Sequence, residues 1–260
     1  MNYGDMELKL NLLVRRIIGK TNLFFWSRII GRITRLVRAA RRTSARTRTL
    51  VLGDSHAWVF LHPLFDLRFP KSVFEVCWVA GATASGLENP NSKTQAGPTF
   101  ERAIQKYPSQ IYILLLGEVD TGFVIWYRAQ KYQASVDEML TLAVDQYANF
   151  IRRLRALGKV IVVSAPLPTI PDENQCGEVA NLRKQVKATQ RERIDLTLAF
   201  NRRVAQACAA EGASFVGLDA LSLDERGLVK KELLNLNPCD HHYDPLAYAR
   251  LLARELERAL

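Results

Sequence analysis

The sequence lacks the short signatures of several large enzyme classes. It contains no Gly-x-x-x-x-Gly-Lys-Ser/Thr loop, no Gly-x-Gly-x-x-Gly segment and no Gly-x-Ser-x-Gly nucleophile elbow. These absences argue against P-loop nucleotide hydrolases, dinucleotide-dependent enzymes and α/β-hydrolases. No run approaches the roughly 18 apolar residues that a membrane-spanning helix needs. The first residues also lack the pattern of a secretory signal peptide, so we expect none.

Cysteine and histidine are scarce. The four cysteines form no Cys-x-x-Cys pair and have no histidine at zinc-like spacing, so we expect free thiols in a reducing, cytoplasmic compartment. Asp54-Ser55-His56 matches the Asp-x-His that opens dinuclear metallophosphoesterase sites. Those sites need several more His, Asp and Asn ligands in spaced motifs, but the chain has four histidines in all and neither Gly-Asn-His-Asp nor Gly-His-x-His. We therefore predict no metal and no other cofactor.

Positive charge is concentrated in the first fifth of the chain. Residues 1–48 hold twelve Lys and Arg against two acids, Asp5 and Glu7, whereas the other 212 residues hold twenty-four of each sign. A protein that binds nucleic acid through its folded domain carries its basic residues there, so nucleic acid is not the expected partner. We predict a basic N-terminal extension at residues 1–48 and a nearly neutral globular domain at residues 49–260.

Residues 8–40 of this extension alternate apolar clusters with arginine. The apolar residues recur at intervals of three and four, which is typical of amphipathic helix, and they include Phe24-Phe25-Trp26. Aromatic residues on one side and arginines on the other are typical of helices that lie in a membrane interface. We predict that residues 8–40 contact an anionic membrane, which would place the protein on its inner face. Docking on the chain's own domain or on a second subunit is the alternative, and a nucleic-acid-binding tail would not need the aromatic cluster.

After Thr49, short apolar runs rich in branched residues alternate with longer segments of helical periodicity. The short runs predict strands at 49–52, 73–79, 111–116, 160–163 and 214–216. The longer segments predict helices at 99–107, 136–157, 191–210 and 245–260. Strands separated by helices form parallel βαβ units, so the fold class is α/β, a three-layer α/β/α sandwich with a five-stranded, mainly parallel sheet. In such a sheet the site lies at the carboxyl ends of the strands.

Short motifs stand at those strand ends in a particular order. Gly53-Asp54-Ser55 follows the first run, Gly81 the second and Gly117-Glu118-Val119-Asp120 the third, and Asp240-His241-His242 precedes the last helix. In this order the motifs resemble those of the SGNH, or GDSL-type, hydrolase family, over residues 49–260. The stretch 81–92 together with 117–120 further resembles members found with bacterial surface-polysaccharide genes.

The chemistry of a serine at a strand end agrees with this resemblance, which implies a flavodoxin-like sandwich with Ser55 as nucleophile. A serine needs a histidine to take its proton. His56 adjoins the serine on a tight turn and His62 falls in an apolar helix, which leaves His241 and His242. Adjacent side chains on an extended stretch point opposite ways, so we expect one of the two to face Ser55. The resemblance favours His242, because an apolar residue and a helix-starting proline follow it.

The resemblance also assigns supporting roles, with two departures from the family pattern. The backbone N–H groups of Ser55 and Gly81 would donate to the oxyanion, and Asp54 would brace the nucleophile turn. The family's third motif ends in Asn-Asp and its Asn helps to hold the oxyanion, but Val119 stands there. The family's acid lies three residues before the base, so Asp240, two residues before His242, is at an unusual spacing. A backbone carbonyl is the alternative group to orient the imidazole.

The residues around the third motif allow two interpretations each. Glu118 and Asp120 are interpreted as supporting acids that fix the loop, since a glycosidase pair would flank a sugar from two sides. Trp126, Tyr127 and Arg128 follow directly. Aromatic residues at this spacing belong either to the core or to a substrate-binding wall beside the serine.

We therefore predict an enzyme, a serine esterase that removes an O-acyl group such as acetyl from a carbohydrate or another small ester. Acyl transfer to a polysaccharide hydroxyl uses the same residues. A non-catalytic, membrane-associated component of a polysaccharide-assembly system is the alternative of a different class, favoured by Val119 and by the displaced acid.

Overall fold

The computed structural model describes residues 47–172 and 188–260, so the extension predicted at residues 1–48 lies almost wholly outside the described residues. The described part holds one sheet of five strands: β1 (Thr47–Gly53), β2 (Ser72–Trp78), β3 (Ile111–Leu115), β4 (Lys159–Val163) and β5 (Ser214–Val216). The strand order is β2-β1-β3-β4-β5, and each neighbouring pair is parallel. This is the doubly wound order of flavodoxin-like sheets. The predicted α/β class and five-stranded sheet are confirmed.

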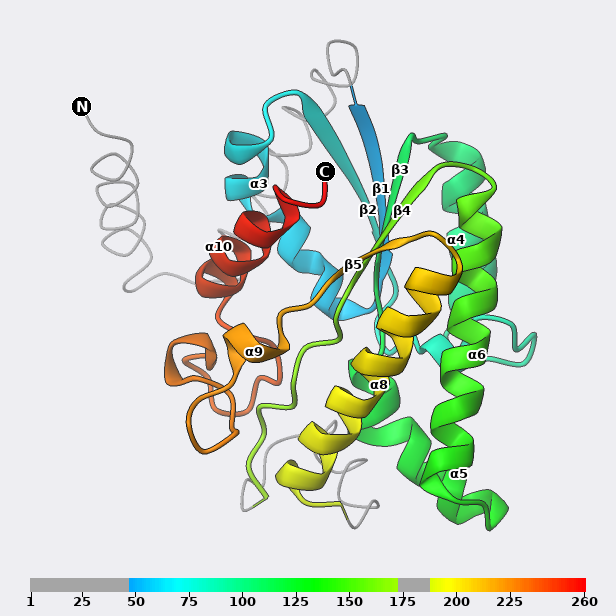
Figure 1. Ribbon diagram of the computed structural model, residues 1–260, viewed down its shortest axis with the longest axis vertical. Helices are drawn as coiled ribbons and strands as arrows, with labels where there is room; N and C mark the ends of the chain where they lie inside the picture. The colour runs from blue at the N-terminus through cyan, green and yellow to red at the C-terminus, as the bar shows by residue number, and fades with distance from the viewer. Residues whose placement is uncertain (1–46, 173–187) are drawn as a thin grey trace. The chain divides into compact units, whose positions relative to one another are not determined.

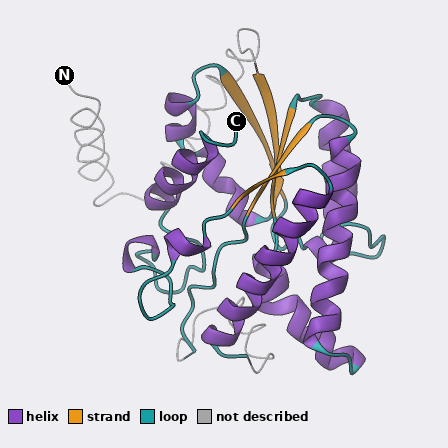
Figure 2. Ribbon diagram, in the orientation of Figure 1, coloured by secondary structure: helices purple, strands orange, loops and turns teal. Residues whose placement is uncertain are grey.

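Helices cover both faces of this sheet (Figures 1 and 2). α4 (Ala96–Lys106), α6 (Val136–Arg155) and α8 (Gln190–Ala210) pack on one face. The short η1 (Ser55–Leu61) and α3 (Pro63–Arg68) lie on the other face with α10 (Pro245–Leu256). Within β1, Leu50 and Leu52 join the first of these clusters and Val51 joins the second. Where a strand is covered on both sides, consecutive positions are apolar, which explains the run from Leu50 to Leu52.

The two longest helices begin at capping boxes. Ser135 and Glu138 exchange hydrogen bonds at the start of α6, as do Thr189 and Glu192 at the start of α8. Each box satisfies two backbone N–H groups that a helix end would leave open. The shorter α5 (Ile125–Tyr132) and α9 (Asp219–Ser222) are not among the predicted helices, because segments this short show little periodicity.

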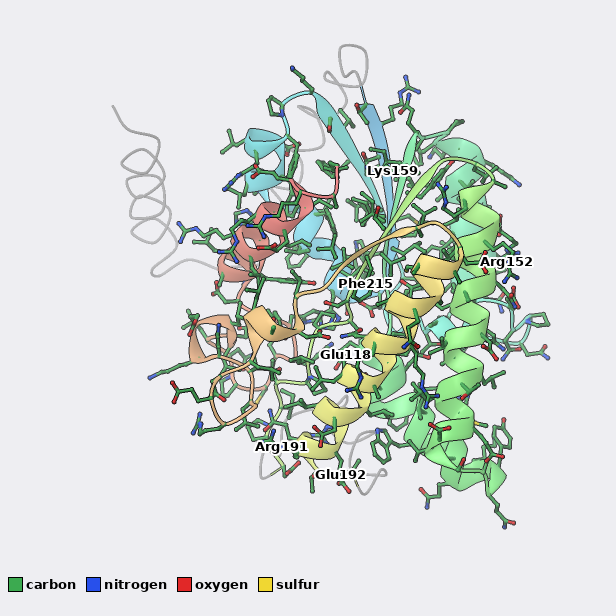
Figure 3. The ribbon with its side chains drawn as sticks, in the orientation of Figure 1. Glu118, Arg152, Lys159, Arg191, Glu192 and Phe215 are labelled. Carbon is green, nitrogen blue, oxygen red and sulfur yellow. The ribbon has the colours of Figure 1, made fainter. Side chains whose placement is uncertain are left out.

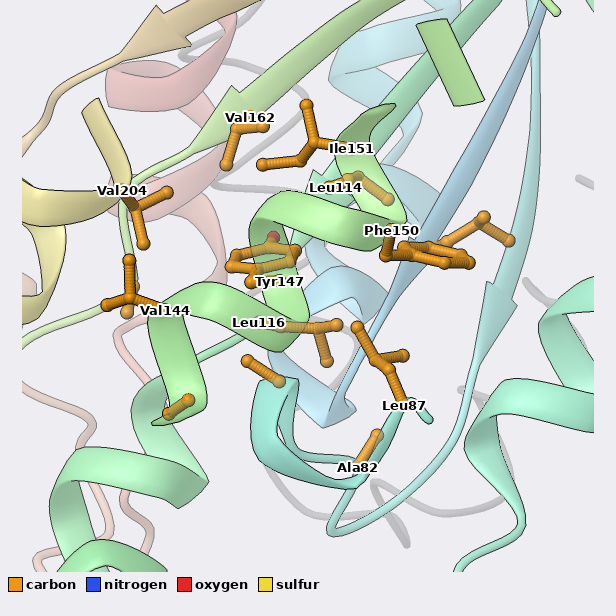
Figure 4. Packing of buried hydrophobic residues seen from close by; sticks show 14 of the residues in the cluster. Ala82, Leu87, Leu114, Leu116, Val144, Tyr147, Phe150, Ile151, Val162 and Val204 are labelled. Atoms are coloured by element: carbon orange, nitrogen blue, oxygen red, sulfur yellow. The ribbon is translucent and has the colours of Figure 1, made fainter. Parts of the chain in front are cut away.

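The buried cluster between the sheet and α6 is tightly filled (Figure 4). Leu114 from β3 and Val162 from β4 pack in one cluster with Tyr147, Phe150 and Ile151 from α6. All five are at most 1 % exposed. Burying one such side chain contributes about 1.5–3 kcal/mol, so this layer holds the central strands in fixed positions. It thereby fixes the strand ends, where the motifs lie.

The cysteines differ from one another. Cys77 and Cys208 are free thiols, but Cys239 is disulfide-bonded, and its partner lies outside the described residues. The expectation of free thiols throughout is therefore wrong for Cys239. Spacing along a sequence does not show which cysteines the fold brings together.

None of the described helices combines the length and the hydropathy that crossing a membrane requires.

Candidate active site

Ser55 stands at the carboxyl end of β1, where the chain turns into η1. Asp54 is the N-cap of η1, and its carboxylate accepts a hydrogen bond from the His56 N–H at 2.8 Å. The backbone N–H of Asp54 donates to the Leu115 carbonyl of β3 at 3.2 Å. At Gly53 a Cβ atom would lie 2.4 Å from that same carbonyl oxygen. Glycine is therefore required before Asp54, and the close approach of β1 to β3 fixes the position of the serine.

The imidazole of His242 joins Ser55 to Asp240 by hydrogen bonds. His242 Nε2 lies 2.8 Å from Ser55 Oγ, although 187 residues separate the two in the sequence. His242 Nδ1 lies 2.6 Å from Asp240 Oδ1. An imidazole held by a carboxylate on one side and bonded to a hydroxyl on the other is arranged to take the hydroxyl proton.

The unusual spacing of Asp240 has a local explanation. Its Oδ1 also accepts the backbone N–H of His242 at 3.0 Å. Aspartate commonly forms such a turn with the N–H two residues later. The turn carries the carboxylate around to the ring of His242. A spacing of two residues therefore suffices, and the carboxylate takes the orienting position for which a backbone carbonyl was the alternative.

His241 does not point away from its neighbour. Its ring centroid lies 4.0 Å from that of His242 and 5.3 Å from that of His56. The expectation that the two adjacent side chains point opposite ways is wrong, because the turn at Asp240 replaces the extended backbone that this expectation assumes. Of the two, His242 is the residue whose ring is bonded to Ser55.

His56 is a site residue that was not predicted from the sequence. It is 3 % exposed, its Nδ1 lies 3.0 Å from Asp54 Oδ1, and its ring centroid lies 4.6 Å from that of His242. Asp54-Ser55-His56 and Asp240-His241-His242 thus share one pattern, Asp-x-His, and that repetition was the available signal. His62 was expected inside an apolar helix. It is instead the N-cap of α3, where its Nδ1 accepts the Leu64 N–H at 3.2 Å.

The environment of His242 favours its neutral form. Burial lowers the pKa of His242, and the charge of His56 lowers it further, while the bond to Asp240 opposes both. Burial alone would raise the pKa of Asp240, but hydrogen bonds from the His242 backbone and ring, with the charges of His242 and His241, bring it below its usual value. A neutral imidazole beside an ionised carboxylate is the form that can accept a proton at neutral pH.

The third motif is joined to the loop of the second. Asp120 is fully buried and accepts the N–H groups of Ala84 at 2.7 Å and Ser85 at 3.1 Å. Burial raises the pKa of Asp120 to about 6, against the opposing effect of its bonds to Ser85. Glu118 is 1 % exposed and lies toward the carboxyl ends of the strands, away from Lys159 at the start of β4 (Figure 3). Its charge raises the pKa of His242.

The remaining predicted residues belong to the turn after β2 and to the segment from Val119 to Arg128. Gly81 has a φ of 71°, which favours glycine, in the turn after β2. Val119 is half-buried, and its side chain has no hydrogen-bond donor. Trp126 packs against the core, and its indole N–H donates to the Thr121 carbonyl at 2.7 Å. Tyr127 is 39 % exposed, and Arg128 reaches the Ser85 carbonyl at 3.4 Å.

Two contacts on either side of His242 hold its loop to the segment after β4. Thr169 Oγ1 donates to the His241 carbonyl at 3.0 Å, and the Leu167 N–H donates to the Tyr243 hydroxyl at 2.9 Å. Thr169 and Tyr243 are both buried. These contacts join segments more than seventy residues apart, so no local sequence pattern could have shown them.

No model of a known protein family matches the chain, and no curated protein matches its sequence. Among solved structures, the chain is similar to a candidate SGNH hydrolase from Slackia heliotrinireducens (18% identity, TM-score 0.51, covering 82% of this chain and 98% of that chain). It is also similar to a GDSL-like lipase from Bacteroides thetaiotaomicron (16% identity, TM-score 0.54, covering 82% of this chain and 89% of that chain). The chain has the SGNH hydrolase fold. The chain is also similar to an acetylxylan esterase from Geobacillus stearothermophilus (13% identity, TM-score 0.52, covering 83% of this chain and 94% of that chain). The resemblance stated from the motifs is confirmed at the level of the fold.

Proposed function

We propose that this protein is a serine esterase of SGNH type. The observation that carries the proposal is the continuous hydrogen-bonded series from Asp240 through His242 to Ser55, at the carboxyl end of β1. Ser55 Oγ attacks the carbonyl carbon of the ester while His242 Nε2 takes its proton. Asp240 stabilises the imidazolium that forms. The same proton then passes to the departing alkoxide, and water repeats the sequence to release the acid and restore the serine.

The oxyanion of the tetrahedral intermediate needs hydrogen-bond donors. We assign the backbone N–H groups of Ser55 and Gly81 to this role, because the side chain of Val119 has no hydrogen-bond donor. Loss of a single donor typically costs about 100- to 1000-fold in rate. We therefore expect slower turnover than in an enzyme with asparagine at this position. The missing donor is also what favours the alternative of a non-catalytic component of a polysaccharide-assembly system.

The proposed substrate is an O-acetylated carbohydrate or another small ester. Support comes from structurally similar esterases, among them the one from Geobacillus stearothermophilus, whose names refer to acetylated xylan and xylooligosaccharides. Tyr127 and Arg128 remain proposed substrate contacts, since Tyr127 is partly exposed and Arg128 lies beside the loop of the second motif. For Trp126 the core role is the better supported one. Resolution of the acyl-enzyme by a sugar hydroxyl instead of water would make the protein an acyltransferase.

The experiment is to follow acetate release from acetylated xylooligosaccharides and from p-nitrophenyl acetate. We expect release by the wild type and none by Ser55→Ala. His62→Asn is the matched control, because it alters a histidine outside the triad and keeps a helix-capping residue. Transfer of acetyl to an added oligosaccharide, without free acetate, would identify the acyltransferase. A folded wild type that neither hydrolyses nor transfers would contradict the proposal and favour the non-catalytic alternative.

The compartment and the membrane contact are also proposals. A position on the inner face of a membrane would follow from the arginines and aromatic residues of positions 8–40. The cytoplasmic prediction depended in part on four free thiols, and the disulfide at Cys239 removes part of that basis, because disulfides persist in oxidising compartments.

A further inference from the structure

Two Asp-x-His turns meet at the nucleophile and hold their imidazoles in the same way. In each turn one carboxylate oxygen accepts both the backbone N–H and the ring Nδ1 of the histidine two residues later. The bonds from Asp54 to His56 measure 2.8 and 3.0 Å, and those from Asp240 to His242 measure 3.0 and 2.6 Å. With Nδ1 engaged, Nε2 is the nitrogen that each of these rings would offer to a ligand.

His241 brings a third imidazole to the same place. One ring nitrogen from each of His56, His241 and His242 lies within 4.8 Å of the others. Three nitrogens bound to one Zn²⁺ at the usual bond length of about 2.0–2.1 Å lie about 3.3 Å apart. Modest rotations of the side chains would close this difference. The ring contacts of 4.0, 4.6 and 5.3 Å between centroids already hold the rings in one cluster.

The chemistry of this cluster is that of a transition-metal site. Imidazole nitrogen suits Zn²⁺ and Cu²⁺, whereas Mg²⁺ and Ca²⁺ take oxygen ligands. A histidine that binds a metal usually donates its other ring N–H to a carboxylate, which fixes the ring and its tautomer. Asp54 and Asp240 already do this for two of the three rings. The scarcity of histidine that excludes a dinuclear site leaves enough for a mononuclear one.

We propose that His56, His241 and His242 bind a single transition-metal ion such as Zn²⁺, and that the ion reversibly inhibits the esterase. Nε2 of His242 has one lone pair in the neutral ring, and that lone pair faces Ser55 Oγ at 2.8 Å. A metal bound to it replaces this hydrogen bond and removes the base that takes the serine proton. No bond of the protein is broken and nothing is oxidised. Binding does not depend on the proposed function, but inhibition does.

The experiment measures binding and activity separately. Full-length Ser55→Ala keeps all three histidines, so it is titrated with ZnCl₂ by isothermal calorimetry and with Co²⁺ by visible absorption, in which a tetrahedral site has characteristic bands. We expect one ion per chain. The second variant, His241→Gln, should bind Zn²⁺ at least about 10-fold more weakly, since even a lost outer-sphere partner costs 10- to 100-fold. His62→Asn is the control and should bind as the parent does. Thermal melts show whether each variant is folded.

The outcomes separate the two claims. If Ser55→Ala binds one Zn²⁺, and wild-type hydrolysis falls with added Zn²⁺ and returns on chelation, both claims stand. If Zn²⁺ binds as expected but the wild type has no esterase activity in metal-free buffer, the site stands and the proposed function fails. If the wild type is an active esterase but folded Ser55→Ala binds no Zn²⁺, the site is overturned. Equal binding by His241→Gln and the parent overturns it as well.

Discussion

The imidazole of His56 packs against that of His242, with 4.6 Å between ring centroids, and each is held by the aspartate two residues before it. The contact makes His56 part of the environment of the base. Its charge contributes to lowering the pKa of His242. Its ring is also almost fully buried. Ser55 and His242, the proposed nucleophile and base, therefore lie in two copies of one local structure.

Asp240→Asn should reduce turnover severely. An asparagine keeps the volume but loses the negative charge that stabilises the imidazolium, and it can present its amide to Nδ1 and select the wrong tautomer. We expect kcat for p-nitrophenyl acetate to fall by about 100-fold or more. Asp244→Asn is the control, because Asp244 caps α10 and asparagine caps a helix equally well. A loss below about 10-fold for Asp240→Asn would show that another group orients His242.

The acid limb of the pH profile should lie below the usual histidine value of about 6.5. The active form has neutral His242, and burial and His56 lower its pKa. Activity is therefore lost as the pH falls through this lowered pKa, and it is retained at pH values where an ordinary histidine is already half protonated. The measurement is kcat/KM against pH, which reports groups of the free enzyme. An acid limb at or above 6.5 would contradict the account.

The fold was largely predictable, because its signals are local. The five apolar runs correspond to β1 to β5, and the periodic segments correspond to α4, α6, α8 and α10. Ser135 and Thr189 each lie three residues before a glutamate. This local pattern is typical of a helix start, and α6 and α8 begin there. The short α3, α5 and α9 carry too few residues to show a period.

The site was predictable only in part. Ser55 and His242 follow from their places at the ends of the chain's elements, and the structure brings them together. For His56 the repeated Asp-x-His pattern was the only signal, and its contact with His242 joins segments that are far apart in the sequence. The same holds for Thr169, whose bond to the His241 carbonyl joins distant segments.

The basic extension should bind anionic vesicles. If residues 8–40 lie in a membrane interface, the full chain should sediment with anionic vesicles and much less with neutral ones. Each basic residue near such a surface contributes about 1 kcal/mol, so replacing Arg28, Arg32, Arg35 and Arg38 by Gln should largely abolish binding, as should removal of residues 1–45. High salt should weaken it, because screening shortens to about 3 Å at 1 M. Equal binding to both kinds of vesicle would contradict the electrostatic account.

The most direct test of the central claim is labelling with a fluorophosphonate probe, with the modified residue identified by mass spectrometry. The probe reacts with a serine whose proton is taken by a neighbouring base. We predict labelling at Ser55 in the wild type, loss of labelling in His242→Ala, and at least about a tenth of the wild-type rate in His241→Ala, since His242 is the ring bonded to Ser55. A folded wild type that is not labelled at Ser55, or labelling lost in His241→Ala and kept in His242→Ala, would contradict the account.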